Sequence, residues 1–368
     1  MIRRADIDFV VAGGARYGMG HVMRSAALAA AAARRGWRVR TFLAGDRVAG
    51  ERWHAAAPEA SVHAWSAWRA SASSPLTVFD HPFAKTRWLA ACRRDRTRSI
   101  VLDDVRAIGR ARLTINPALH HMSLGEDENS LESPEDDPAS LSLRGPRYAI
   151  LSEAHRETSH RPLLERTSLL LSLGGADPHA VTPRIAPLLA GVLAHTELAP
   201  TILVRRAVLG PAFADPEGRV ALALAAAGWQ VERGLEPLAM ARRMADARIA
   251  VMGFGTSLCE LAWHGTPHLS VTHHVQDEAW ATRLEERGIG GWLGHAESLD
   301  PTCVTSRFAR ALADLPWQIE SAQRALDEIE GGRGCERILE RLAWIAREVS
   351  LPGRESGLGH GQRPAPLS

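Results

Sequence analysis

Short apolar segments alternate with longer amphipathic ones along the first half of the chain. The apolar segments have the length of buried strands, and helix-length segments separate several of them. Strands are predicted at residues 7–12, 39–43, 77–80, 99–102 and 113–116, and helices at 25–35 and 84–94. Residues 62–74 predict a weak strand followed by a loop. Strands separated by helices imply right-handed crossovers, so this half predicts a parallel α/β sheet.

The second half repeats the alternation after a polar segment, residues 155–166, where we place a domain linker. Just before it, residues 146–151 have a strand-like pattern. Strands are predicted at residues 167–173, 201–204, 230–232, 249–252 and 268–271, and helices at 180–193, 237–245, 258–264 and 277–287. Residues 317–349 predict one or two closing helices, interrupted at Gly331-Gly332.

These patterns predict two α/β domains, residues 1–155 and 166–349, followed by a disordered tail at 350–368. Each half has a glycine turn at the carboxyl end of its first predicted strand. In open α/β sheets, ligands bind at that end of the strands. We therefore predict a ligand-binding cleft between the two domains.

Composition narrows the class of protein. The 368 residues are 45% hydrophobic and 23% charged with a formal net charge of +2, as in soluble globular proteins. No basic run is long enough to follow a nucleic-acid backbone, and no apolar stretch reaches the roughly 18 residues of a membrane span. The four cysteines lie far apart, which excludes the usual zinc spacings and favours a reducing compartment. We expect a cytoplasmic protein that binds no nucleic acid and is a monomer.

A glycine-rich loop, residues 16–24 (RYGMGHVMR), joins the first predicted strand to the first predicted helix. Backbone N–H groups and the positive end of the helix dipole meet there, which favours an anion. The loop departs from a dinucleotide fingerprint because Met23 occupies the place of the third glycine. His21 is either a structural histidine or a base that takes a proton from a water beside the anion, and its setting favours the base. Arg24 either binds a phosphate or carboxylate or closes the domain.

A second loop, residues 253–257 (GFGTS), opens a predicted helix and is another candidate anion site. Thr256 or Ser257 is the predicted N-cap. Glu260 would either accept hydrogen bonds from two vicinal ribose hydroxyls or serve as a dipole or capping-box partner. Cys259 lies among them, but no base partner is apparent, so we expect it to pack.

Other clusters of polar residues are weaker candidates. His273-His274 resembles a metal cluster, but adjacent histidines point in different directions and further ligands are missing, so we expect no metal. Gln276, at a helix start, is better suited to donate a hydrogen bond to a sugar or phosphate. Asp103-Asp104 is either a turn or cap or a catalytic pair. Seven acids without a base at residues 125–137 favour a solvated loop over a metal cage.

Several motifs of the chain occur in the order seen in a known enzyme family. They are residues 18–24 (GxGHxxR), 80–81 (DH), 102–104 (LDD), 116–117 (NP), 145–149 (GPRYA), 172–178 (SLGGADP), 240–245, 255–257 (GTS) with Glu260, and Gln276. In this order they resemble the PseG/SpsG family, the UDP-2,4-diacetamido-2,4,6-trideoxy-beta-L-altropyranose hydrolases of pseudaminic acid biosynthesis. The resemblance covers about residues 7–347.

That family is similar in architecture to the peptidoglycan glycosyltransferase MurG, so the resemblance implies a GT-B fold of two Rossmann-like domains. It implies hydrolysis of a UDP-sugar at the anomeric carbon with inversion, without metal or cofactor, and with His21 as the general base that activates water. It assigns substrate binding to Gly18, Gly20, Arg24, Asp80 and Gln276. It assigns UDP binding to Gly174, Gly175, Met240, Gly253, Gly255, Thr256, Ser257 and Glu260.

Two departures from the family pattern fall in the implied sugar site. Pro82-Phe83 stands where the family usually has a tyrosine, and Val275 stands where it tends to have an asparagine. Each change removes a hydrogen-bonding side chain, worth roughly 1 kcal/mol. Cleavage of a nucleotide-sugar is therefore a firmer prediction than the identity of the sugar.

Functions of other classes remain open. An inverting GT-B glycosyltransferase would need an acceptor in place of water, for which Trp65, Trp68 and Trp88 could form an apolar patch, although packing is their more ordinary role. An inactive nucleotide-sugar-binding homologue would account for the departures in the sugar site. A nicotinamide dehydrogenase is disfavoured by the broken fingerprint.

Overall fold

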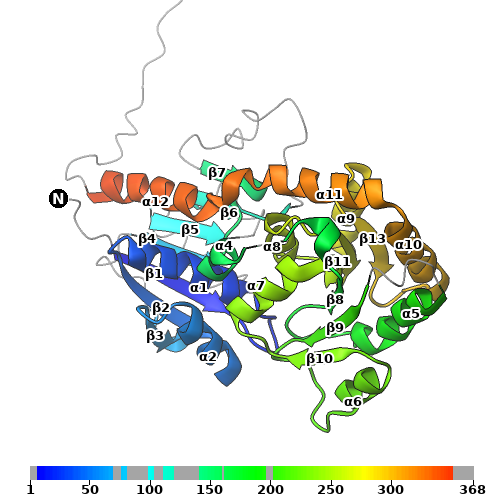
Figure 1. The fold of residues 1–368 in the computed structure, drawn as a ribbon. Helices are drawn as coiled ribbons and strands as arrows, with labels where there is room; N and C mark the ends of the chain where they lie inside the picture. Colours follow the sequence, from blue (N-terminus) through cyan, green and yellow to red (C-terminus); the bar gives the residue numbers. More distant parts are fainter. Residues whose placement is uncertain are drawn as a thin grey trace, which may run out of the picture.

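Two parallel sheets lie side by side in the computed structural model (Figure 1), which describes residues 6–68, 76–80, 98–102, 111–119, 141–159, 161–195 and 202–350. The first has the strand order β3-β2-β1-β4-β5-β6-β7 and the second β10-β9-β8-β11-β12-β13. Each order reverses direction beside its first strand, which is the doubly wound arrangement. The chain is an α/β protein of GT-B architecture.

The first sheet is built from short, mostly buried strands. They are β1 (Asp6–Ala12), β2 (Arg38–Ala44), β3 (Ser61–Ala64), β4 (Leu76–Asp80), β5 (Ser99–Leu102), β6 (Leu113–Asn116) and β7 (Leu141–Arg144). Helices α1 (Gly20–Arg34) and α2 (Arg47–Ala56) pack against it, and 3-10 turns follow at η1 (Trp65–Ala67) and η5 (Pro146–Tyr148). Apolar residues of β1 and the small residues of α1 share one core because alanines let the helix approach the sheet closely.

The second sheet follows a short connection, α4 (Glu153–Glu157) and η6 (Leu163–Glu165). Its strands are β8 (Ser168–Ser172), β9 (Val204–Leu209), β10 (Gln230–Arg233), β11 (Ala247–Gly253), β12 (His268–Thr272) and β13 (Gly291–His295). Its helices are α5 (Val181–His195), α6 (Arg219–Ala226), α7 (Pro237–Asp246), α8 (Ser257–Trp263), α9 (Glu278–Glu286), α10 (Pro301–Ala313) and α11 (Leu315–Glu328), with 3-10 turns η8 (Val275–Asp277) and η9 (Glu330–Gly332).

The last helix, α12 (Gly334–Ser350), returns to the first half of the chain. Figure 1 shows it beside β5 and α1, far from α10. Its buried side chains Ile338, Leu342 and Ile345 belong to the same apolar cluster as Ile7 and Phe9 of β1. The chain turns between α11 and α12 at Gly331, whose φ of 73° is suited to glycine. The chain therefore crosses between the two halves both before β8 and after α11.

Most predicted elements coincide with observed ones, and a few predictions are wrong. Residues 146–151 are not a strand: Gly145 has φ 92° and Pro146 starts the turn η5. The strand predicted at 201–204 lies later, because β9 begins at Val204 and Leu203 is 71% exposed. The helix predicted from residue 25 already begins at Gly20. The sequence patterns gave no prediction for β7, β13, α2, α6 or α10.

Several predictions fall outside the residues that the structure describes. They concern the helix at 84–94, the pair Asp103-Asp104, the acidic segment 125–137, Pro82-Phe83, Trp88 and the tail from residue 351. Trp65 and Trp68 do lie in the described part, and both pack against an apolar cluster that contains Phe79. No helix within the described ranges combines the length and the apolar character that a membrane crossing requires.

Candidate active site

The loop between β1 and α1 is held in a fixed shape by its own glycines and by Asp46. Gly14 and Gly18 form a bridge and have φ values of 104° and 79°, a backbone region that glycine adopts without steric cost. Asp46, the N-cap of α2, accepts hydrogen bonds from the backbone N–H of Ala15 at 2.8 Å and of Ala49 at 2.9 Å. The start of α2 thus fixes the loop that leads to His21.

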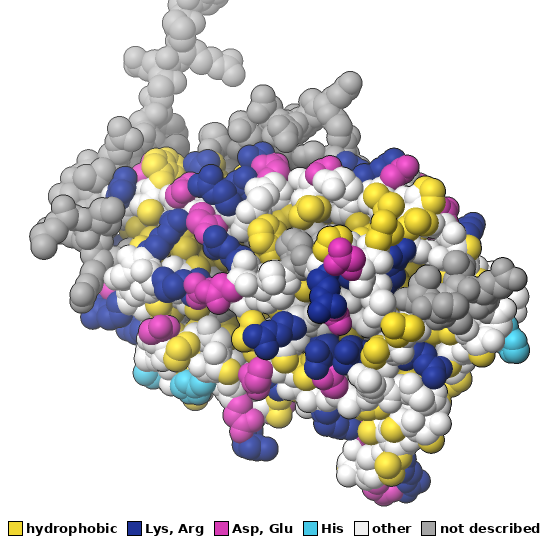
Figure 2. Space-filling model, in the orientation of Figure 1, with side chains coloured by type: hydrophobic (Ala, Val, Ile, Leu, Met, Phe, Trp, Pro, Cys, Tyr) yellow, Lys and Arg dark blue, Asp and Glu magenta, His cyan; other side chains and the backbone are white. Residues whose placement is uncertain are grey.

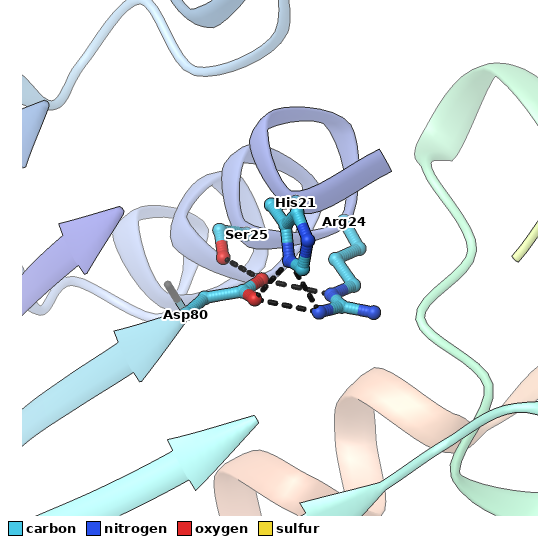
Figure 3. A network of polar contacts seen from close by, with 4 residues as sticks. All are labelled: His21, Arg24, Ser25 and Asp80. Atoms are coloured by element: carbon cyan, nitrogen blue, oxygen red, sulfur yellow. Dashed lines mark hydrogen bonds and ion pairs between the residues drawn. The ribbon is translucent and has the colours of Figure 1, made fainter. Parts of the chain in front are cut away.

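Helix α1 begins at Gly20 and brings His21, Arg24 and Ser25 to the end of β4 (Figure 3). Its N-terminus carries no side-chain cap and no acid in the first turn. The positive end of its dipole therefore acts on any group that lies in front of the loop. His21 is placed in that first turn as predicted, with 22% of its side chain exposed.

Asp80, the last residue of β4, is fully buried and binds all three side chains. Its Oδ1 lies 2.7 Å from Nδ1 of His21 and accepts from Nη2 of Arg24 at 2.6 Å. Its Oδ2 accepts from Nε of Arg24 at 2.8 Å and from Oγ of Ser25 at 2.7 Å. The Arg24–Asp80 pair is bidentate, the strongest form of such a contact, and it is sealed from solvent.

The charge of Asp80 is stabilised by its partners. Burial by itself raises the pKa of Asp80, but the charges and hydrogen bonds of Arg24 and His21 outweigh it, so the pKa of this carboxyl lies well below its ordinary value. Asp80 is therefore a carboxylate at neutral pH, and its negative charge compensates the positive charge of Arg24.

This carboxylate also selects one tautomer of His21. Nδ1 lies 2.7 Å from both Oδ1 of Asp80 and Nη2 of Arg24. Nη2 of Arg24 already donates to Oδ1 of Asp80 at 2.6 Å and does not need Nδ1 as an acceptor, whereas an unprotonated Nδ1 would turn its lone pair toward the carboxylate oxygen. We assign the proton to Nδ1, which donates to Asp80 and leaves the lone pair on Nε2. A carboxylate that orients a histidine in this way prepares its other nitrogen to act as a base.

A cavity of about 170 Å³ lies between the two halves and collects most of the predicted site. From the first half it is lined by Met19, Gly20, Met23 and Arg24 of the loop and of α1. From the second half it receives these residues predicted to bind UDP: Gly174, Gly175, Met240, Thr256, Ser257 and Glu260. The structure thus brings together two glycine turns that are more than a hundred residues apart in the sequence.

Contact across this cavity depends on the absence of side chains. A Cβ atom at Gly175 would lie 2.8 Å from Cβ of Met19, and one at Gly20 would lie 3.6 Å from Oγ1 of Thr256. A Cβ atom at Gly210 would lie 2.3 Å from the carbonyl oxygens of Gly174 and Gly175. Gly175 therefore allows the two halves to approach each other, a Cβ atom at Gly20 would make only an ordinary contact, and Gly210 allows close approach of two loops within the second half.

The second anion site, at the start of α8, differs from the prediction in its cap. Thr256 is the N-cap residue but has helical φ and ψ, and its side chain makes no capping hydrogen bond. Glu260 lies beyond the capping-box position, and its Oε1 lies 3.5 Å from Nε2 of His155. Glu260 is the only carboxylate among the described residues that line the cavity.

Some predicted residues do not line the cavity as described. These are His21, Gly18, Asp80, Gly253, Gly255 and Gln276, and Gln276 is exposed in η8. Their roles in binding or catalysis stay predictions. Cys259 is buried and donates a weak hydrogen bond to the carbonyl of Pro117, so it packs as expected. Within the described ranges, His273 and His274 belong to no group that could hold a metal ion.

The cavity also contains residues that the sequence did not single out. Arg52 of α2 reaches across to the second half, where it donates to the carbonyls of Gly234 and Leu235, the latter at 3.1 Å, and to Oε1 of Glu236 at 2.8 Å. His155 lines the cavity from the segment predicted as a linker. Only the glycine and proline after β9, at 210–211, carried a usable signal, because they repeat the strand-then-glycine pattern of the other turns.

Charge outside the cavity is mixed. Figure 2 shows basic and acidic side chains interspersed over the face that it draws, in keeping with a net charge of +2. A face of this kind does not resemble a nucleic-acid interface, which gathers basic groups.

A scan against protein-family models and a search of curated proteins returned no match. Solved structures share the fold along nearly the whole chain. The calicheamicin glycosyltransferase CalG4 has a TM-score of 0.58 at 19% identity, covering 95% of this chain and 100% of its own. Acinetobacter baumannii MurG has 0.58 at 13% identity, covering 92% and 99%. S. aureus MnaA, solved with UDP, has 0.63 at 11% identity, covering 93% and 97%.

Proposed function

We propose that this chain is an enzyme that transfers the sugar of a UDP-sugar, with His21 as the base that deprotonates the acceptor hydroxyl. The observation that carries the proposal is the contact of 2.7 Å between Nδ1 of His21 and the buried carboxylate of Asp80. With the proton assigned to Nδ1, Nε2 is the nitrogen that can accept a proton. His21 would take the proton of the attacking hydroxyl. Attack by that hydroxyl from the face opposite to the leaving diphosphate gives inversion at the anomeric carbon.

The cavity suits the nucleotide part of such a donor. It is lined by two glycine turns and by the start of α8, where backbone N–H groups can bind phosphate oxygens. The same donors would stabilise the charge that develops on the leaving diphosphate, which is the main demand of this reaction. Arg52 adds a positive side chain at the edge of the cavity. The similarity in fold to MurG, CalG4 and UDP-bound MnaA is consistent with a UDP-sugar as ligand.

Two acceptors are compatible with this base. A hydroxyl of a second molecule would make the protein an inverting glycosyltransferase, the activity for which CalG4 and MurG are named. Water would make it a UDP-sugar hydrolase like the PseG/SpsG family, which the order of motifs from GxGHxxR to Gln276 favours. A metal is not required by either form, because the glycine turns and helix N-termini can stabilise the diphosphate.

The test follows UDP release from a panel of UDP-sugars without added metal, with and without hydroxyl acceptors. His21→Gln is expected to reduce turnover by about 10²–10⁴-fold. His54→Gln is the matched control, since His54 is an exposed histidine of α2. Release without an acceptor identifies the hydrolase, and release only with an acceptor identifies the transferase. Unchanged turnover in His21→Gln would refute the role of His21.

A further inference from the structure

His155 is a buried histidine whose ring faces two residues, one in α8 and one at its C-cap, at the edge of the cavity. It belongs to α4, in the segment between the two sheets, and is only 4% exposed. Its backbone carbonyl accepts a hydrogen bond from Nε1 of Trp263 at 2.9 Å. Its position is therefore fixed by α8, the same helix that carries Glu260.

Both ring nitrogens of His155 face partners. Nδ1 lies 3.0 Å from Nε2 of His264, and Nε2 lies 3.5 Å from Oε1 of Glu260. His264 is fully buried, and its carbonyl accepts from Nη2 of Arg166 at 2.8 Å. The three side chains of His264, His155 and Glu260 thus form a row that leads from the buried His264 to the wall of the cavity.

The protons of this row can be assigned from its chemistry. A carboxylate only accepts hydrogen bonds, so Nε2 of His155 faces it favourably only when it carries a proton. With both histidines neutral, Nε2 of His264 then donates to Nδ1 of His155, and Nε2 of His155 points its proton at Glu260. With His155 charged, the inner bond reverses and the outer donor stays the same. In both states His155 offers a donor to Glu260.

The position of Glu260 makes this donor consequential. Glu260 is the sole carboxylate among the described lining residues, in a cavity that also presents anion-binding turns. A carboxylate repels a diphosphate, so it is tolerated there only if it meets donors from the ligand. Two vicinal hydroxyls match the two oxygens of a carboxylate. The contact of 3.5 Å is longer than a hydrogen bond, and such contacts in unliganded sites tighten when the ligand binds.

We propose that His155 is a positioning residue that orients Glu260 toward the 2′- and 3′-hydroxyls of the nucleotide's ribose, so that the site selects ribonucleotides over 2′-deoxyribonucleotides. The proposal rests on the proposed function, since it takes the cavity as the nucleotide site. His155 would then determine specificity for the ribose, although it lies in the segment that connects the two sheets and not in a glycine turn.

The experiment compares the binding of UDP and 2′-deoxy-UDP by calorimetry. The wild-type protein is expected to bind UDP about tenfold more tightly, the value of about one hydrogen bond to a charged group. His155→Leu removes the donor and is expected to bring the two dissociation constants within about twofold of each other, mainly by weakening UDP. His155→Gln keeps an N–H donor and should restore part of the preference. His195→Gln, at an exposed histidine of α5, is the control.

Outcomes separate the two proposals. If His155→Leu keeps the full preference for UDP, or if the wild-type protein shows no preference, the positioning role is refuted while nucleotide binding stands. If the wild-type protein binds neither nucleotide, the proposed function fails first. Glu260→Gln combined with His155→Leu should be no worse than Glu260→Gln alone, because both changes act through one contact. Thermal unfolding of each variant identifies a variant that fails to fold, in which case His155→Gln decides.

Discussion

Replacing Asp80 with asparagine tests whether the buried charge network orders the catalytic loop. Asp80→Asn keeps the shape of the side chain but removes its charge. The guanidinium of Arg24, with 5% of its side chain exposed, would lose the carboxylate that it binds in bidentate fashion. In either orientation of the new amide, its NH₂ group replaces an oxygen that faces two donors, Oδ1 or Oδ2. In each orientation, one N–H group of Arg24 would then lose the oxygen to which it donates.

The expected loss of stability follows from these contacts. Breaking one partner of a buried ion pair costs about 3–5 kcal/mol. The matched control is Asp8→Asn on the adjacent strand β1. Asp8 also accepts two hydrogen bonds from an arginine, Nε and Nη2 of Arg40 at 2.8 and 2.9 Å, but the Arg40 side chain is 36% exposed. Water can solvate Arg40, so this control should cost only about 1 kcal/mol.

Urea unfolding followed by tryptophan fluorescence measures both variants. Activity gives the second readout, because Asp80 acts through His21: Asp80→Asn should reduce UDP release by no more than His21→Gln does. The double variant should be about as active as the less active single variant. A stability loss for Asp80→Asn equal to that of Asp8→Asn, or a double variant far less active than either single one, would contradict the arrangement described here.

Other changes test the pH response and the contact between the halves. Burial lowers the pKa of His268 to about 4, so the unfolded chain binds a proton that the folded chain rejects. The contribution of neutral His268 to the free energy of unfolding should therefore be fully present above pH 6.5 and should fall by up to about 3 kcal/mol as the pH drops toward 4. In His268→Leu this pH dependence should be absent from urea unfolding measured at several pH values. Gly175→Ala places a methyl group against Met19 and should weaken UDP binding about tenfold in calorimetry. The reason is that overpacking typically costs about 1–3 kcal/mol, and tenfold in affinity corresponds to about 1.4 kcal/mol. Unchanged affinity would show that the halves separate without cost. Arg52→Ala removes the hydrogen bonds to the segment around Leu235 and should increase the radius of gyration in solution scattering and weaken UDP binding, whereas an unchanged radius would show that other contacts hold the halves together.

The site could be predicted only in part from the sequence, and the reason is physical. Gly18, Gly20 and His21 lie within a few residues of one another, and a strand, a glycine turn and a helix define that local shape. Asp80 was predicted through its motif. Its hydrogen bonds with Arg24 and Ser25, however, depend on β4 lying beside β1, which no local pattern encodes. His155 and Arg52 carry no local signal, because their partners are about a hundred or more residues away.

The class of fold and the order of most of its elements could be predicted from the sequence alone. Apolar strands and Ala-rich helices are set by local periodicity, and the glycine turns at the carboxyl ends of β1 and β8 follow from backbone freedom that only glycine has. Three features depend on the packing of the whole chain: α12 returns to the first core, Met19 contacts Gly175, and Glu260 faces His155. Such contacts join distant segments, and their free energy depends on burial and distance that arise once the two sheets are assembled.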